Sequence, residues 1–334
     1  MAKESVLESL EIVKVICMEL SGKNVLVTGG AGLVGGHVVE KLLALGAKVV
    51  VLDIEVRPKS YFESEKLQEK TKLILQDVRD LGKLKELILA ENITYIFHLA
   101  AQALVPLAYE DPKLTLDTNI MGTVNVLEVA RLIPSVKAVV VASSDKAYGK
   151  DCRNAVESQA LIGDHPYDVS KSAADLICTA YFRTYGVPVT VSRFGNIYGP
   201  GDLNFDRIIP GIMKAAISDE ALQIRSDGKF IRDYVYVKDV ADGYILLMEK
   251  IDQTKGEAFN FSTGYNFSVL DLQEKIGKII GKKIKTEILN NQKNEIPSQS
   301  LNFDKAVKML GWESKYSFED GIGQTFEWYK NYLK

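Results

Sequence analysis

A tyrosine and a lysine are spaced so that they can act as one acid–base unit. Tyr167 and Lys171 lie in the segment YDVSK, and residues four apart on a helix project from the same face. A lysine ammonium beside a phenol favours the phenolate. If a positive nicotinamide ring adds to that field, the phenol pKa of about 10 can fall toward neutrality, which would create a general base. The alternative is an ordinary surface pair, because this spacing is common by chance.

A second group of polar residues follows the apolar run AVVVA. Ser143, Ser144, Asp145 and Lys146 come where this predicted strand ends, and open α/β sheets bind ligands at that edge. We expect Ser144 to hydrogen-bond a reacting hydroxyl beside Tyr167. Asp145 and Lys146 would supply an acid and a base next to one another. The alternative for these two is an ion pair or a solvated loop.

A glycine-rich turn follows the first predicted strand, NVLVT. Gly29, Gly32 and Gly35 have the spacing GxxGxxG, and Leu33 and Val34 open the helix that follows. Without side chains, the backbone amides can approach a pyrophosphate, and the helix N-terminus adds partial positive charge. The turn therefore predicts a dinucleotide site.

Asp53 ends the second predicted strand, where a carboxylate can accept hydrogen bonds from the adenosine ribose. It would also repel a 2′-phosphate, which favours NAD over NADP, although Arg57 keeps NADP open. Asp77 and Val78 follow the third strand and could flank the adenine. Asp77 could equally cap the next helix.

The elements that must position these residues alternate regularly. From residue 24 to about 192, helical stretches separate the runs NVLVT, KVVVL, KLIL, TYIFHL, KAVVVAS and PVTVSR. This alternation predicts an α/β, Rossmann-like, doubly wound parallel sheet with a smaller α/β substrate-binding part.

We expect four divisions of the chain. Residues 1–20 form an amphipathic N-terminal extension, and the natural start could instead be Met18. Residues 21–192 form a dinucleotide-binding domain, to which residues 230–258 return. Residues 193–229 and 259–334 form a substrate-binding domain.

The composition is that of an ordinary globular protein: 334 residues, 46% hydrophobic and 25% charged. A net charge of −3 and a pI of about 5.8 give no basic footprint for nucleic acid or an anionic membrane. The N-terminal segment lacks the unbroken apolar run of a signal peptide or membrane span. Three scattered cysteines and three histidines predict no disulfide framework, no metal and a cytoplasmic location.

Five motifs occur in a familiar order: TGGAGLVGG, HLAAQ, SSDKAYG, YDVSK and RFGNIYGPGD. From residue 24 to about 315 the chain resembles the extended short-chain dehydrogenases/reductases of the NAD-dependent epimerase/dehydratase family, which act on nucleotide sugars. The resemblance implies NAD as cofactor and a nucleotide-diphosphate sugar as substrate. It also implies cofactor contacts from Leu99, Ala100, Ala101, Tyr167 and Lys171.

The same resemblance implies substrate contacts in the second half of the chain. Asn196 would lie near the sugar phosphate, and Arg232, in an R-D-[FYW] segment, would meet the diphosphate. Gln102 and Arg207 are further candidates, and either arginine could instead form a structural ion pair. We expect His98 to be a packing and hydrogen-bonding residue.

Asp145 and Lys146 separate the possible reactions. In the family, epimerases usually carry small or neutral residues there, 4,6-dehydratases carry Asp-Glu, and Asp-Lys resembles the CDP-glucose 4,6-dehydratase branch. We therefore expect a nucleotide-sugar 4,6-dehydratase in which Asp145 is the acid and a desolvated Lys146 the C5 base. The alternatives are a nucleotide-sugar 4-epimerase and a cofactor-binding protein without turnover.

The resembling family pairs two helices from each subunit in a four-helix bundle. The corresponding segments are 115–132 and 168–185, so we expect a homodimer. Small apolar residues on the second helix would form the close contact: Ala173, Ala174, Ile177 and Ala180.

Overall fold

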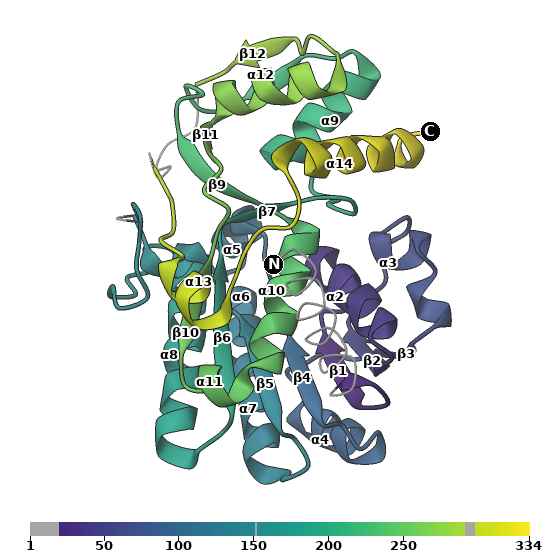
Figure 1. The fold of residues 1–334 in the computed structure, drawn as a ribbon, viewed down its shortest axis with the longest axis vertical. Coiled ribbons are helices and arrows are strands. Elements are labelled where there is room, and N and C mark those ends of the chain that lie inside the picture. The colour runs from purple at the N-terminus through teal and green to yellow at the C-terminus, as the bar shows by residue number, and fades with distance from the viewer. Residues whose placement is uncertain (1–19, 151, 291–297) are drawn as a thin grey trace, which may run out of the picture.

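The computed structural model describes residues 20–150, 152–290 and 298–334 (Figure 1), so the predicted extension lies outside the described residues except for Leu20. Seven parallel strands form one sheet in the order β10-β6-β5-β4-β1-β2-β3. The strands are β1 (Asn24–Thr28), β2 (Lys48–Asp53), β3 (Lys72–Leu75), β4 (Tyr95–His98), β5 (Ala138–Ala142), β6 (Val189–Phe194) and β10 (Ala258–Phe261).

The two faces of this sheet bury separate hydrophobic cores. Alternate residues of a strand point to opposite faces, and Val25 and Val27 of β1 belong to one core while Leu26 belongs to the other. The chain runs outward from β1 in both directions, so β1 and β4 meet at the point where the strand order reverses. The predicted doubly wound fold is confirmed, and ligands bind such folds at this reversal.

Helices cover both faces (Figure 1). The core on one side includes residues of α2 (Leu33–Ala44), α3 (Tyr61–Ser64), η1 (Leu67–Glu69), α10 (Val237–Glu249) and α13 (Asp304–Leu310). The opposite core includes residues of α4 (Leu81–Ala90), α7 (Gly122–Leu132) and α8 (Pro166–Tyr185). Shorter elements connect them: α5 (Val105–Glu110), α6 (Pro112–Leu116), the π-helical turn η2 (Asp117–Met121), η3 (Asp145–Tyr148) and α11 (Ile251–Thr254).

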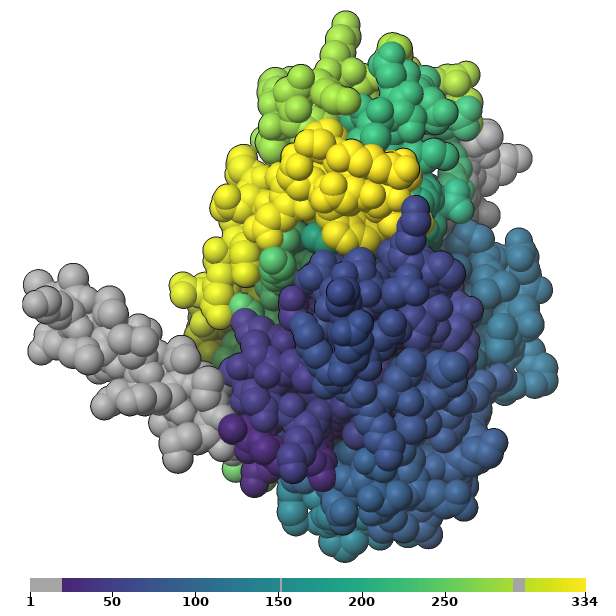
Figure 2. Space-filling view, turned by 90° about the vertical axis from the view of Figure 1, so that its right-hand side faces the viewer, coloured from purple at the N-terminus to yellow at the C-terminus, as the bar shows by residue number. Residues whose placement is uncertain are grey.

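A smaller part with its own core lies beyond the carboxyl ends of the strands. It contains the sheet β11-β9-β7, the pair β12-β8 and three helices. Their bounds are β7 (Asn196–Tyr198), β8 (Leu222–Ile224), β9 (Ile231–Tyr236), β11 (Asn266–Ser268), β12 (Thr286–Ile288), α9 (Ile208–Ser218), α12 (Val269–Ile280) and α14 (Phe318–Tyr332). Figure 2 shows the yellow α14 above the purple N-terminal residues, where Lys59 Nζ lies 5.6 Å from the centre of the Tyr332 ring.

The division between the two parts differs from the prediction. Residues 231–236 form β9, which pairs with β7 and β11 in the small sheet, so the predicted return to the large domain at 230–258 begins too early. It also ends too early, because β10 runs to Phe261 and pairs with β6, and α13 packs beside it. Strand patterning alone does not indicate which sheet a strand joins.

Candidate active site

A cleft of about 1760 Å³ lies between the large sheet and the smaller part. Residues from both parts line it, including every predicted cofactor, substrate and catalytic residue except Lys171. Lys171 is 6% exposed on α8, one turn from Tyr167. The topology has therefore brought segments from residue 29 to residue 232 to one cleft.

Two glycines of the turn, Gly29 and Gly35, leave no space for a side chain. Gly29 has φ +70, and a Cβ there would lie 2.7 Å from the backbone nitrogen of Ala100. A Cβ on Gly35 would collide with the carbonyl oxygen of Gly29. Gly32 caps α2, so the N-terminus of α2 begins at the cleft. The turn fits a pyrophosphate, which needs close backbone approach and positive potential.

Asp53 is tied to this turn. Its Oδ2 accepts a hydrogen bond from Ala31 N at 2.9 Å, and its Oδ1 accepts one from Ile54 N at 2.8 Å. Burial raises the pKa of Asp53, and these hydrogen bonds partly offset the rise. Arg57 is the cation that kept NADP open as an alternative. Its Nε lies 2.9 Å from Glu55 Oε1, so its positive charge is compensated by an ion pair. The residues at this end of the cleft fit NAD.

The third strand leads to the other predicted cofactor residues. Asp77 Oδ2 pairs with Arg79 Nη2 at 2.6 Å, and hydrogen bonding to Arg79 holds the pKa of Asp77 below its usual value. The helix cap is Asp80, which accepts from Lys83 N at 3.1 Å, so the alternative of Asp77 as cap is wrong. Val78 is buried beside the cleft.

The turn η3 holds the predicted acid and base. Ser144 Oγ donates to Asp145 Oδ1 at 2.9 Å, whereas the buried Oδ2 has no hydrogen-bond partner among the described residues. Lys146 Nζ donates to Oε1 of Gln299, from a segment more than 150 residues away. The Asp145–Lys146 ion pair is therefore not formed, and sequence reasoning missed Gln299 because nothing local indicates so distant a partner.

In the protein alone, the pKa of the Tyr167 phenol lies above its usual value. Burial raises the pKa of Tyr167 to about 12, the negative charge of Asp145 adds to the rise, and a hydrogen bond with Ser144 opposes it. Lys171 Nζ donates to the carbonyl of Ala142 at 2.8 Å, and burial lowers the pKa of Lys171 to about 8. The predicted lowering of the phenol pKa rests on Lys171 together with the positive nicotinamide ring, so it stays a prediction for the enzyme with NAD bound.

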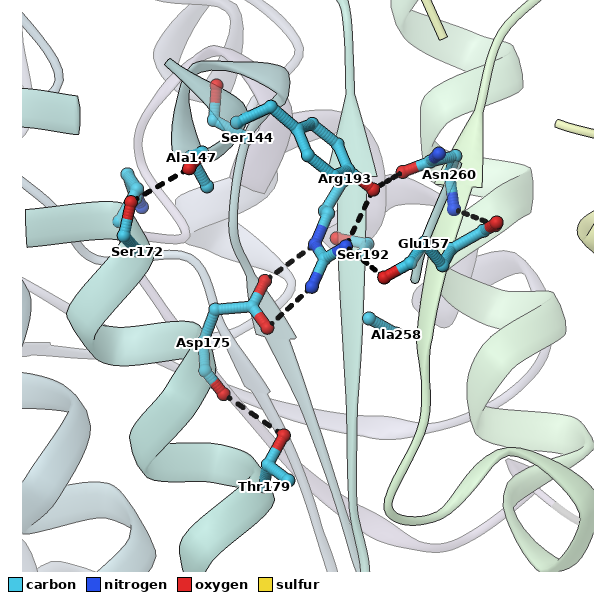
Figure 3. A network of polar contacts seen from close by, with 12 residues as sticks. Ser144, Ala147, Glu157, Ser172, Asp175, Thr179, Ser192, Arg193, Ala258 and Asn260 are labelled. Atoms are coloured by element: carbon cyan, nitrogen blue, oxygen red, sulfur yellow. Dashed lines mark hydrogen bonds and ion pairs between the residues drawn. The ribbon is translucent and has the colours of Figure 1, made fainter. Parts of the chain in front are cut away.

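A buried polar network supports α8 and η3 from below (Figure 3). Arg193 Nε and Nη2 bind the two carboxylate oxygens of Asp175 at 2.7 and 2.8 Å, and Nη1 donates to Tyr148 OH at 2.6 Å. Tyr148 OH in turn donates to Asn260 Oδ1 at 2.8 Å. One signal could have revealed this network: an arginine inside the apolar strand VTVSRF needs a buried partner.

Asn119, which sequence reasoning also missed, positions the loop after β4. Asn119 is buried in the π-helical turn η2. Its Oδ1 accepts a hydrogen bond from Gln102 N at 2.7 Å, and its Nδ2 donates one to Ser170 Oγ at 2.8 Å. The side-chain amide of Gln102, a predicted substrate residue, forms two hydrogen bonds with the backbone of Leu104. Its Oε1 accepts from Leu104 N at 2.8 Å, and its Nε2 donates to Leu104 O at 2.9 Å. Gln102 therefore shapes this part of the cleft wall.

Three further predicted residues lie on the side of the cleft formed by the smaller part. Asn196 Nδ2 is buried without a partner in the part of the chain that the structure describes. Arg207 forms the ion pair weighed as its alternative role, with Asp202 Oδ2 at 2.7 Å. Arg232 Nη1 donates to its neighbour's carbonyl, and its guanidinium lies 5.8 Å from the centre of the Phe230 ring. All three line the cleft.

His98 has the hydrogen-bonding role predicted for it. Its Nδ1 lies 2.8 Å from Thr28 Oγ1 and its Nε2 lies 3.1 Å from Thr123 Oγ1, so both ring nitrogens are engaged. Burial lowers the pKa of His98 to about 3, which keeps the ring neutral.

Two buried carboxylates beside the site were not predicted. Burial raises the pKa of Asp168 and of Asp233 to about 7, and the charge of Asp145 contributes to both shifts. Asp168 Oδ1 lies 3.2 Å from His165 Nε2.

Within residues 20–150, 152–290 and 298–334, no group of three His, Cys, Asp or Glu residues could hold a metal ion, and no helix is long and apolar enough to cross a membrane.

The doubly wound sheet, the glycine turn, Asp53 and the Tyr167–Lys171 pair define an extended short-chain dehydrogenase/reductase. Residues 25–262 match the NAD dependent epimerase/dehydratase family. The chain belongs to this family, as the motifs predicted.

Several characterised proteins are similar to it. A CDP-glucose 4,6-dehydratase from Salmonella typhimurium is 32% identical over 94% of this chain and 92% of the relative. A UDP-glucuronate 4-epimerase from Thermodesulfobacterium geofontis is also 32% identical, over 92% of this chain and 97% of the relative. The crystal structure of a dTDP-glucose 4,6-dehydratase from Streptomyces venezuelae with NAD bound has a TM-score of 0.83 and 28% identity, covering 92% and 97% of the two chains. Against a trifunctional plant relative from Arabidopsis thaliana, at 30% identity, the chain spans about half the length (47%).

Proposed function

We propose that the protein is an NAD-dependent 4,6-dehydratase of a nucleotide-activated hexose, with CDP-glucose or a close relative as substrate. The observation that carries this proposal is the position of Asp145 and Lys146, which line the same cleft as Ser144 and Tyr167. An acid and a base beside the oxidation site are needed for loss of water but not for epimerisation. The similarity to the Salmonella CDP-glucose 4,6-dehydratase supports this choice.

The first chemical step uses Tyr167 as the base that accepts the O4 proton, with Ser144 hydrogen-bonded to the reacting hydroxyl. NAD, when bound, supplies reversible hydride acceptance. The turn at Gly29–Gly35 would hold its pyrophosphate and Asp53 its adenosine ribose. Lys171 orients the end of β5 through its hydrogen bond to Ala142.

The second step is elimination across C5 and C6. Lys146 accepts the C5 proton, the C5–H electrons form the new double bond, and the C6–O bond breaks. Asp145 donates a proton to the departing hydroxyl, which leaves as water. In a third step the hydride taken from C4 would return to C6 and a proton would be added at C5, so that the product is a 4-keto-6-deoxy sugar and the net change is the loss of one water.

The smaller part would hold the nucleotide diphosphate. Asn196 supports this role most directly, since it lines the cleft and its buried Nδ2 has no hydrogen-bond partner among the described residues. We expect Arg232 to contact the diphosphate and Gln102 to shape the sugar pocket. Arg207 would contact the diphosphate while its other nitrogens keep Asp202 and the carbonyl of Ile197, 2.7 Å away.

A nucleotide-sugar 4-epimerase is the second candidate. It would use the same Ser144, Tyr167 and Lys171 but would return hydride to C4. The similarity to the UDP-glucuronate 4-epimerase favours it, whereas Asp145 and Lys146 would then have no chemical task.

Mass spectrometry of purified enzyme incubated with CDP-, GDP-, UDP- and dTDP-sugars separates the two candidates. Dehydration yields a product lighter by one water, and epimerisation yields one of unchanged mass. We expect loss of water and retention of NAD in preference to NADP. An unchanged mass with every sugar that reacts would establish the epimerase instead.

We also propose a homodimer built on α7 and α8. Exposed apolar side chains support it: Met121 (47%), Leu132 (46%), Val169 (41%) and Leu176 (57%). Two of the residues predicted for this face differ in burial. Ala174 is buried inside the chain, so it cannot form the contact that was predicted for it, whereas Ala180 is exposed. Sedimentation as a monomer at micromolar concentration would contradict the dimer.

A cytoplasmic location is also proposed, supported by the free Cys152 and Cys178.

A further inference from the structure

The partner of Lys146 is a side chain that does not line the cleft. Gln299 is 0% exposed, and its Oε1 accepts a hydrogen bond from Lys146 Nζ. Because a lysine donates, the carbonyl oxygen of the amide must face Nζ. Its Nε2 then points elsewhere, and in the described ranges it has no hydrogen-bond partner. Gln299 can therefore reach the reaction only through Lys146.

The backbone around Gln299 is held by two other segments. Gln299 N donates to the carbonyl of Ile231 at 3.1 Å, beside β9. Ser300 N donates to Cys152 O at 2.7 Å, and Ala155 N donates back to Ser300 O at 3.1 Å. These bonds fix Gln299 between the smaller part and the loop that follows η3. A rigid acceptor restrains a flexible lysine side chain better than a mobile one.

The charge of the acceptor also matters. Several titratable groups face Lys146: Asp145 beside it, Asp168 and His165 at the start of α8, and Cys152 on the following loop. A carboxylate in the place of Gln299 would add another negative charge and stabilise the ammonium. The amide oxygen accepts a hydrogen bond while adding no net charge, which leaves the amine free to exchange a proton.

We propose that Gln299 is the positioning residue for Lys146. Its amide oxygen holds Nζ at the sugar end of the cleft through a neutral hydrogen bond, so that Lys146 can take the C5 proton. This inference rests on the proposed dehydratase function, in which the C5–H electrons form the double bond and the C6 hydroxyl leaves as water with a proton from Asp145.

The contact itself can be tested without turnover. Lys146 is labelled with an amine-selective reagent in substrate-free enzyme, and the rate is followed by peptide mass spectrometry. Gln299→Met should label Lys146 about threefold faster or more, because it removes one hydrogen bond, and Gln299→Glu should label it more slowly than wild type. The control is Gln324→Met, which breaks another Lys–Gln pair, with Lys238 Nζ at 2.8 Å, outside the cleft. Equal rates in wild type and both Gln299 variants would overturn the proposal.

The consequence for catalysis is tested on the same proteins. Gln299→Met should lower kcat for loss of water about tenfold, the value of one hydrogen bond to a charged group, with KM changed by less than about twofold. Gln299→Glu keeps an acceptor, and its activity should need a higher pH, by about one unit, because the carboxylate favours the ammonium. A wild-type kcat in Gln299→Met together with a wild-type pH profile in Gln299→Glu would overturn the positioning role. If wild-type enzyme instead converts sugars without losing water, the proposed function fails, and the labelling rates alone decide whether Gln299 holds Lys146.

Discussion

The two sides of the cleft are built in different ways. On the cofactor side, Gly29–Gly35 and Asp53 come from adjacent elements and satisfy one another, as in the bond from Ala31 N to Asp53 Oδ2. On the sugar side, buried polar atoms from three segments that line the cleft have no hydrogen-bond partner among the described residues: Ser143 Oγ, Asp145 Oδ2, Asp168 Oδ2 and Asn196 Nδ2. Gln76 Nε2 is the comparable atom near the cofactor side.

This difference indicates where the binding free energy for the substrate resides. Leaving a buried polar group unpaired costs about 1–3 kcal/mol, and a ligand rich in hydroxyls and phosphate oxygens can satisfy such groups. The polar groups on the cofactor side already satisfy one another, whereas those on the sugar side would be satisfied by the substrate. Variants on the sugar side should therefore separate chemical steps, and the following experiments test that expectation.

The largest effect is expected for Tyr167→Phe. Removing the general base should lower product formation about 100- to 10,000-fold and also abolish the near-ultraviolet absorbance of reduced nicotinamide, because the O4 proton must leave before C4 is oxidised. The control is Tyr109→Phe, another tyrosine that lines the cleft, which should keep both signals. Reduced nicotinamide in Tyr167→Phe would show that another residue is the base.

A stability change follows from the support beneath the site. Asp175→Leu would leave Arg193 buried without its bidentate partner, so the free energy of unfolding in urea should fall by about 3–5 kcal/mol. Glu274→Ala, which removes the exposed pair with Lys278, should change it by less than about 0.5 kcal/mol. Similar values for both variants would mean that the network does not hold α8 and η3.

Lys146→Met should separate the two chemical steps. We expect oxidation at C4 to continue, so that reduced nicotinamide accumulates on mixing with substrate, while loss of water falls at least about tenfold, or 1.4 kcal/mol of barrier. The control is Lys150→Met, an exposed lysine also at the cleft. A Lys146→Met enzyme that dehydrates faster than about a tenth of the wild-type rate contradicts the role of C5 base.

A separate effect concerns the pH dependence of stability. Burial raises the pKa of Asp233 to about 7 in the folded protein, so between about pH 4 and 7 the folded state binds more protons than the unfolded state. Its stabilising effect is complete below that range and is lost as pH rises through it, at about 1 kcal/mol per pH unit. Asp233→Asn should flatten this slope in urea unfolding series. An unchanged slope would mean that Asp233 is ionised in the folded protein.

The sequence predicted the cofactor side well because its residues are close along the chain. Hydrophobic alternation predicted the parallel sheet, and the glycine spacing with Asp53 predicted the dinucleotide turn. Residues that act across the fold were missed. Arg193 with Asp175, Asn119 in its π-helical turn, and Gln299 beside Lys146 depend on contacts between distant segments, which no local pattern encodes.

The pKa of a buried group is also hard to predict from the sequence. Tyr167 and Lys171 have the predicted spacing, but the phenol pKa depends on burial and on Asp145, which spacing does not reveal. In the same way, β9 reads as an ordinary strand, and only its pairing with β7 places it in the smaller part.

The central claim is that Asp145 and Lys146 make this family member a dehydratase. The most direct test is turnover of CDP-glucose in deuterium oxide, with the product analysed by mass spectrometry and proton NMR. The dehydratase mechanism predicts a 4-keto-6-deoxy sugar that has lost the oxygen and hydrogens of one water and carries solvent deuterium at C5. A product that retains its oxygen, with its C5 hydrogen unexchanged and only the C4 configuration changed, would contradict it.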